Sequence, residues 1–249
     1  MTKSSAPIIE IKELTHAYGD STILHDLNLT IPEGEIFGFL GHNGAGKTTT
    51  ISILTTLLRQ TAGTVRIAEH DTIKENQAVR AAIGYLPENV TFYNDLTAYE
   101  NLAYFARLSG VPNVDERIDE VLGFLDFRGI EHRRLKTFSK GMRQRIGIAQ
   151  AILHEPRVLF LDEPTSGLDP MGIKNLRDTI LRLNREKGIT IFMNTHLLSE
   201  VAKTCTSIGV LNNGRLVYRE SLKNTLKQFP DEVSLEEIYV RMETVREAQ

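Results

Sequence analysis

One glycine-rich segment of eight residues restricts this chain more than any other feature. Gly41-His-Asn-Gly-Ala-Gly-Lys-Thr48 fits the pattern G-x-x-x-x-G-K-[ST]; the apolar run Ile36–Leu40 precedes it and a helix-period segment follows it. A strand, a glycine loop and a helix in this order predict a phosphate-binding loop. Without Cβ atoms in the way, successive backbone N–H groups can converge on phosphate oxygens, and the positive end of the following helix faces the same anion.

Two side chains of this loop have specific expected roles. Lys47 places a full positive charge between the β- and γ-phosphates, and the Thr48 hydroxyl is positioned to ligate Mg²⁺. ATP and Mg²⁺ are therefore the expected ligands. The residues predicted to contact the nucleotide here are Gly41, His42, Asn43, Gly44, Ala45, Gly46, Lys47, Thr48 and Thr49.

A second anchor is the apolar run Val158–Leu161, which ends in two adjacent carboxylates. Asp162 is expected to hold Mg²⁺, directly or through water, and Glu163 to polarise the attacking water as a general base. Apolar strands often end in acidic turn residues, so this motif is weak by itself. It becomes strong in combination with the upstream loop.

Short apolar runs alternate with helix-period segments, which predicts an α/β fold with a mainly parallel sheet. Asn213–Gly214 between two late runs predicts a hairpin, and hence an antiparallel edge. The expected strands are Ile8–Leu14, Ser21–Ile31, Glu35–Leu40, Gly63–Ile67, Ala82–Leu86, Val158–Leu161, Ile189–Met193, Ser207–Leu211 and Arg215–Tyr218.

The segment from Leu96 to Leu153 is almost purely helical in pattern, and Thr97 with Glu100 forms a T-x-x-E capping box. We therefore expect an ATPase core (1–90 and 155–220), an inserted helical subdomain (91–154) and a C-terminal helical tail (221–249). The tail has a second capping box, Ser234 to Glu237. Its apolar stripe is expected to be core or self-packing surface and consists of Leu235, Ile238, Tyr239 and Met242.

Composition limits the partners and the compartment. The formal net charge is −3, with 29 basic and 32 acidic residues, which argues against a protein bound mainly through nucleic-acid phosphates. Cys205 is the single cysteine, so a reducing compartment is expected. No secretory pattern occupies residues 1–10, and no run reaches the ~20 apolar residues that span a bilayer. We expect a cytosolic chain that serves any membrane process through a partner.

Together with these motifs, Phe138-Ser-Lys-Gly-Met142 resembles the L-S-G-G-Q signature of ATP-binding-cassette (ABC) nucleotide-binding subunits, and Ser139 lies nineteen residues before Val158. The similarity extends from about Ile8 to Tyr218. It implies a P-loop NTPase core in which two subunits sandwich two ATP molecules. Ser139 and the Gly141 N–H of one subunit would then address the γ-phosphate on the other. Lys140 and Met142 depart from the signature, whereas the phosphate-facing residues are kept.

The resemblance also implies roles for four further residues. Tyr18 is similar to the aromatic residue that stacks on adenine, and Asp169 ends the loop Ser166–Asp169 that crosses the dimer interface. His196 resembles the switch histidine that contacts the γ-phosphate and positions the general base. Glu88 stands where the family commonly has a Gln that reaches Mg²⁺. An isolated tyrosine or histidine is more often structural, and the less favoured interpretation of Glu88 is a solvated loop acid after Pro87.

The function implied is ATP hydrolysis that powers transport through a separate membrane permease, with the chain peripheral on the cytoplasmic face of the membrane and paired with a second nucleotide-binding subunit. Leu-Pro-Glu88, the signature and Asn101–Gly110 resemble the export branch. An import subunit is the second functional hypothesis. A non-transport ABC ATPase acting on ribosomes or nucleic acid is the third. It is disfavoured because one P-loop is present and only ninety-two residues separate Lys47 from Ser139.

Overall fold

The computed structural model describes residues 7–229 and 234–247, and its largest element is a six-stranded sheet of order β10-β9-β3-β8-β7-β6. Every neighbouring pair is parallel except β9 and β10, which the turn at Asn213–Gly214 joins. The predicted parallel sheet with an antiparallel edge is confirmed. Its strands are β3 (Ile36–Leu40), β6 (Ile83–Leu86), β7 (Val158–Asp162), β8 (Thr190–Asn194), β9 (Ser207–Asn212) and β10 (Arg215–Ser221).

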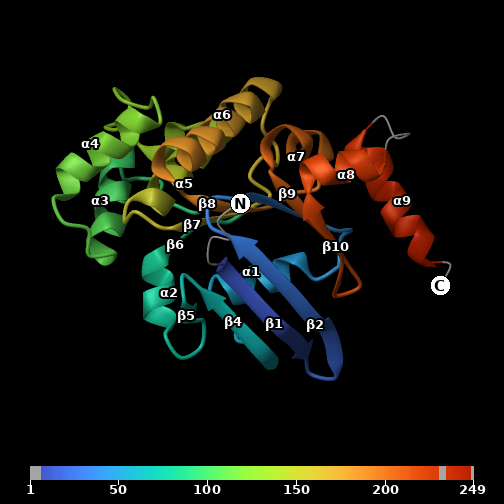
Figure 1. Cartoon of the computed structure of the whole chain (residues 1–249). Coiled ribbons are helices and arrows are strands. Elements are labelled where there is room, and N and C mark those ends of the chain that lie inside the picture. Colours follow the sequence, from blue (N-terminus) through green and yellow to red (C-terminus); the bar gives the residue numbers. More distant parts are fainter. Residues whose placement is uncertain (1–6, 230–233, 248–249) are drawn as a thin grey trace, which may run out of the picture.

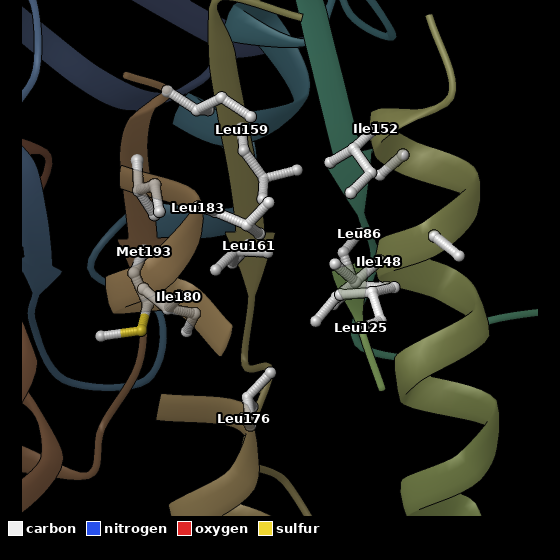
Figure 2. Close-up of a cluster of buried hydrophobic side chains, with 14 of the residues drawn as sticks. Leu86, Leu125, Ile148, Ile152, Leu159, Leu161, Leu176, Ile180, Leu183 and Met193 are labelled. Atoms are coloured by element: carbon white, nitrogen blue, oxygen red, sulfur yellow. The ribbon is translucent and has the colours of Figure 1, made fainter. Parts of the chain in front are cut away.

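Successive side chains of each strand point to opposite faces of this sheet, and both faces are covered by other elements. On one face the rings of Phe37, Phe39 and Phe160 lie 5.2 to 5.5 Å from the ring of Phe192, and all four side chains are fully buried. The other face is aliphatic and is covered by α5 (Lys140–Ile152), α6 (Pro170–Lys187) and α7 (Leu198–Thr204) (Figure 1). Figure 2 shows side chains of α5 and α6 directed toward β7 and β8.

A second sheet of order β2-β1-β4-β5 packs with α1 (Lys47–Leu54) on the phenylalanine face (Figure 1). All its pairs are antiparallel. The early hairpin therefore belongs to a separate sheet and not to the edge of the parallel one. The strands are β1 (Pro7–Tyr18), β2 (Ser21–Pro32), β4 (Ala62–Ile67) and the unpredicted β5 (His70–Asp71).

Three helices lie between β6 and β7 in the sequence: α3 (Ala98–Leu108), α4 (Val114–Phe124) and α5, with a short 3₁₀ turn at Leu135–Thr137. The capping box at the start of α3 is confirmed. The Glu100 N–H donates to Thr97 Oγ1 at 3.1 Å, and the Thr97 N–H donates to Glu100 Oε2 at 2.7 Å. A helix that was not predicted, α2 (Asn76–Ala82), takes Ala82 from the expected strand. The division into core, subdomain and tail stays a prediction.

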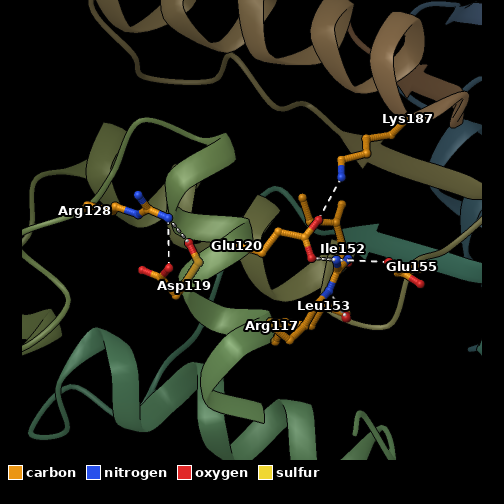
Figure 3. Close-up of polar contacts among 8 residues, drawn as sticks. All are labelled: Arg117, Asp119, Glu120, Arg128, Ile152, Leu153, Glu155 and Lys187. Carbon is orange, nitrogen blue, oxygen red and sulfur yellow. Dashed lines mark hydrogen bonds and ion pairs between the residues drawn. The ribbon is translucent and has the colours of Figure 1, made fainter. Parts of the chain in front are cut away.

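Arg117 of α4 is the centre of a polar network that holds this helix to its neighbours (Figure 3). Its guanidinium donates to the carbonyl oxygens of Ile152 and Leu153 at the end of α5, at 2.9 and 2.8 Å. It also contacts Glu120 at 2.7 Å, and Glu120 in turn contacts Lys187 of α6 at 2.9 Å. The otherwise orphan carbonyls at the end of α5 thus gain donors from α4.

The C-terminal part contains α8 (Leu222–Gln228) and α9 (Leu235–Glu247). Ser234 Oγ accepts a hydrogen bond from the Glu237 N–H at 3.3 Å, the first half of the predicted capping box. Leu235 and Ile238 are buried in the aliphatic core, as the stripe predicted, whereas the Met242 side chain lies outside the described residues. Within 7–229 and 234–247, no helix has the length and apolar character that crossing a membrane requires.

Candidate functional site

The candidate site lies at the carboxyl edge of the parallel sheet. Because β3, β6, β7 and β8 run in the same direction, the segments that follow them meet at this edge. They surround a cavity of about 340 Å³ that joins the glycine loop to carboxylates of two other segments. Its lining residues are Tyr18, Ile23, Asn43, Gly44, Gly46, Lys47, Thr48, Thr49, Glu88, Asp162, Glu163 and Asn194.

The glycine loop has a backbone that other residues would strain. Gly44 and Gly46 have φ of 87° and 106°, in the left-handed region that favours glycine. A Cβ on Gly46 would also lie 2.7 Å from Leu24 Cδ2 of β2. Gly46 directly precedes α1, so the first backbone N–H groups of that helix open toward the cavity. The loop can therefore receive an anion at the positive end of α1.

Lys47 is a charged residue that is almost completely buried. Its side chain is buried, and its Nζ donates to the carbonyl oxygens of Gly41 at 2.6 Å and His42 at 3.0 Å. Both acceptors belong to the loop itself, so the ammonium is held at the loop's centre. A phosphate in the loop would meet this charge at short range, where the low local dielectric strengthens the attraction.

Asp162, at the end of β7, has an environment suited to a divalent cation. Its carboxylate is buried, and Oδ1 accepts a hydrogen bond from Asn194 Nδ2 at 2.7 Å. Burial raises the pKa of Asp162, as does the nearby Glu88 carboxylate, while the bond from Asn194 and the charge of Lys47 oppose this. Burial, together with the charge of the neighbouring Asp162 carboxylate, raises the pKa of Tyr85 to about 12.

These donors fit Mg²⁺, which typically takes one or two carboxylates beside substrate phosphates. Asp162 and Thr48 line the same cavity and would hold the ion, and Glu88 lies on the same wall. Glu88 is exposed, and its Oε1 accepts a weak hydrogen bond from Ser166 Oγ at 3.4 Å. The structure therefore brings Thr48, Asp162 and Glu88 to one cavity.

Glu163 and His196 form a close pair beside this group. Glu163 Oε2 lies 2.8 Å from His196 Nδ1; the glutamate side chain is 16% exposed and the histidine side chain 70%. Glu163 has φ of 46°, an uncommon value for a residue with a side chain. A half-buried carboxylate and an imidazole open to solvent can together orient and deprotonate a water molecule.

A larger cavity, about 530 Å³, continues past this pair. It is lined by Gly41, His42 and Glu163, by His196 and by Tyr239 of α9. Several lining residues were not predicted from the sequence, among them Asn194 and Tyr239, which was interpreted only as part of a packing stripe. Asn194 had a usable signal, since it is a polar residue directly after the apolar run ending at Met193.

Three predicted site residues lie elsewhere on the chain. Ser139 caps α5 and accepts from the Met142 N–H at 3.3 Å, and Asp169 caps α6 and accepts from the Gly172 N–H at 3.0 Å. Together with Gly141 they line a separate cavity of about 250 Å³, which shares no residue with the one around Lys47. The predicted site residues of this chain are therefore divided between two separate groups of cavities.

Comparisons with known proteins agree with this geometry. Residues 24–166 match the family described as ABC transporter. YhcH of Bacillus subtilis (strain 168), an uncharacterized ABC transporter ATP-binding protein, is 44% identical over 218 residues, 87% of this chain and 71% of that protein. The bacitracin transport ATP-binding protein BcrA of Bacillus licheniformis is 43% identical over 213 residues, 84% of this chain and 68% of that protein. A solved ATP-binding subunit of an ABC transporter superposes with a TM-score of 0.84 at 31% identity, covering 94% of this chain and 99% of that one.

Proposed function

Because the chain belongs to the ABC transporter family, as an ATP-binding subunit, we propose that it hydrolyses ATP and thereby powers export through a separate permease. The single observation that carries the hydrolytic step is the 2.8 Å contact between Glu163 and His196, beside Asp162 and the Lys47 loop. This contact supports Glu163 as the base and His196 as the group that orients it. ADP and phosphate would be the products.

Each side chain of the site has a defined part in this reaction. Lys47 and the loop N–H groups hold the phosphates, and Tyr18 offers a ring to the adenine. Mg²⁺, when bound, neutralises phosphate charge. Glu163 takes a proton from the attacking water, and His196 holds the Glu163 carboxylate in place through Nδ1. With Glu163 ionised, the proton of this contact lies on Nδ1, which leaves Nε2 directed away from the pair.

We also propose that two subunits complete each site. Ser139 and Gly141 line a cavity apart from the Lys47 loop. Ser139 stands at the positive end of a 13-residue helix, where an anion is favoured. A second subunit could present this end to the γ-phosphate held by Lys47. ATP would then stabilise the closed dimer, and hydrolysis would remove the phosphate that bridges the two subunits.

Substituting the proposed base tests the hydrolytic assignment. Glu163→Gln is expected to reduce phosphate release at least about 100-fold, since general bases contribute roughly 10²–10⁴ to rate. ATP affinity should persist, because Lys47 and the loop are untouched. Light scattering should then show an ATP-dependent dimer. Glu186→Gln, the same change at an exposed position of α6, is the control. Near-normal turnover in Glu163→Gln would remove Glu163 as the base.

The permease is proposed to dock on an exposed apolar surface that we call the docking patch, formed by Tyr93, Leu96, Tyr104 and Leu108. The Tyr93 and Tyr104 rings lie 5.3 Å apart, and Leu108 is 67% exposed. The patch begins five residues after Glu88. Glu88 lines the cavity around Lys47, which we call the nucleotide cavity, so a movement there has a short path to the docking patch. Exposed aromatic clusters of this kind are typical of interaction sites.

Export is the proposed direction of transport. The Leu-Pro-Glu88 and Asn101–Gly110 segments resemble the export branch, and the relative BcrA is named for bacitracin transport. Recovery of the Glu163→Gln protein from membranes in Mg·ATP identifies the integral protein that accompanies it. Inside-out vesicles containing both proteins should then accumulate the transported substrate when ATP is added. ATP-driven loss of substrate from such vesicles would indicate import.

A further inference from the structure

Asn194, the last residue of β8, contacts both carboxylate residues of the site. Its position in the sheet lies between Asp162 of β7 and Phe39 of β3. Its side-chain Nδ2 donates to Asp162 Oδ1 at 2.7 Å, and its backbone oxygen accepts from the Glu163 N–H at 2.9 Å. One residue therefore fixes the carboxylate proposed to hold the metal and the backbone of the proposed base.

The other end of the Asn194 amide has no such partner. Asn194 is 2% exposed, and within the described part of the chain its Oδ1 is a buried acceptor without a hydrogen-bond donor. The amide nitrogen donates to Asp162 Oδ1, so the amide oxygen at the other end of the group faces elsewhere. A buried acceptor left unpaired costs roughly 1–3 kcal/mol. A folded protein keeps such an unpaired acceptor where a bound ion, water or ligand supplies the missing hydrogen bond.

The surroundings of this oxygen indicate what that partner is. Asn194 lines the same cavity as Lys47, Thr48 and Asp162. Mg²⁺ keeps several of its waters when it binds through one or two carboxylates and phosphates. Those waters are donors, and protein groups that accept from a metal's waters tune its affinity about 10–100-fold.

We propose that Asn194 is a positioning residue for the metal–nucleotide complex: its amide N–H orients the Asp162 carboxylate, and its Oδ1 accepts a hydrogen bond from a water coordinated to the metal. This inference rests on the proposed ATP and Mg²⁺ binding at the Lys47 loop. Tyr85 also interacts with the Asp162 carboxylate, but it has no amide oxygen and does not line the cavity. Substitutions at Asn194 and at Tyr85 can therefore distinguish an effect on Asp162 alone from the loss of a contact with the metal-bound water.

The test measures metal binding without turnover, with Mn²⁺ as the probe and Glu163→Gln as the background. Asn194→Leu removes both the donor and the acceptor at similar volume, and Tyr85→Phe is the control that removes a neighbouring hydroxyl while the Asn194 amide stays in place. Electron paramagnetic resonance titration with ATP gives the Mn²⁺ dissociation constant. A parallel titration in EDTA gives the metal-free ATP affinity. We expect Asn194→Leu to weaken Mn²⁺ binding about 10–100-fold while changing metal-free ATP affinity less than about twofold.

Several outcomes decide between the alternatives. Unchanged Mn²⁺ affinity in Asn194→Leu overturns the proposal, and so does a loss in Tyr85→Phe as large as that in Asn194→Leu, since orientation alone would then explain it. A parallel loss of metal-free ATP affinity also overturns it, because the role would be structural. If Asn194→Leu does not fold, Asn194→Ser replaces it, with a loss of at least about threefold expected. Absence of metal-dependent ATP binding before the Asn194 change contradicts the proposed function itself.

Discussion

Tyr18 stands at the entrance of the nucleotide cavity with more than half of its side chain in solvent. Tyr18 is 53% exposed, and its ring forms a T-shaped pair with the ring of His16, with 4.7 Å between the ring centroids. Tyr18 also lines the cavity around Lys47, so its exposed ring is accessible to a ligand there, which agrees with the adenine role implied by the resemblance. A stacked base contributes roughly 1–3 kcal/mol.

Replacing this ring tests the stacking role. Tyr18→Ala is expected to weaken ATP binding about tenfold, measured by calorimetric titration, because one stacked pair is lost. Tyr18→Phe keeps the ring and should retain the affinity within about twofold. Tripolyphosphate has no base, so its affinity should not respond to either change. If Tyr18→Ala binds ATP as tightly as the unchanged protein, the stacking role is wrong.

The residues that belong to the site could be predicted from the sequence where they form part of a local motif. The glycine loop, Asp162 and Glu163 occupy fixed spacings beside apolar runs, and the structure places them at one cavity. Asn194 differs, because its contacts depend on which strands flank β8. The order β3-β8-β7 is a tertiary property, and no spacing in the sequence reveals it. Tyr239 reaches the site by packing of the tail, which is equally non-local.

Secondary-structure elements were likewise predictable where a local sequence pattern signals them, and were missed where they depend on tertiary contacts. The parallel strands were predicted within one residue of their ends, because burial on both faces makes each an apolar run. Helix α2 was missed because Val79 is its only buried residue within Asn76–Ala82, and one apolar contact gives no periodic stripe. The two-residue strand β5 exists through its pairing with β4, which no local pattern signals.

The capping box of α3 allows a prediction for a single element. Thr97→Ala removes the side-chain acceptor for the Glu100 N–H and should lower the free energy of unfolding by about 1 kcal/mol, measured by urea denaturation. Thr97→Ser keeps the hydroxyl and should lose less than half of that amount. ATP affinity should remain the same in both variants, since Thr97 does not line the nucleotide cavity. Equal losses in the two variants would show that the hydroxyl is not the cause.

At the scale of the whole molecule, the nucleotide edge and the helices α3 to α5 are parts of one packed body. Ile148 and Ile152 of α5 belong to the same buried cluster as Leu161 of β7, while Arg117 ties α4 to the end of α5 (Figures 2 and 3). Close-packed interiors transmit displacement because they have few voids to absorb it. A shift at Glu88 or in the loop after Glu163 can therefore reach the docking patch.

This continuity makes the docking patch the place to separate coupling from catalysis. The double variant Tyr104→Ser, Leu108→Ser removes two exposed side chains one helical turn apart on α3. Buried aromatic anchors contribute about 2 kcal/mol or more to an interface, so recovery of the integral membrane partner with the Glu163→Gln protein in Mg·ATP should fall at least about tenfold. ATP affinity should stay within about twofold, because neither side chain lines the nucleotide cavity. Leu57→Ser is the matched control, since Leu57 is also 67% exposed but follows α1. An equal loss in Leu57→Ser, or full recovery in the double variant, would place the permease elsewhere on the molecule.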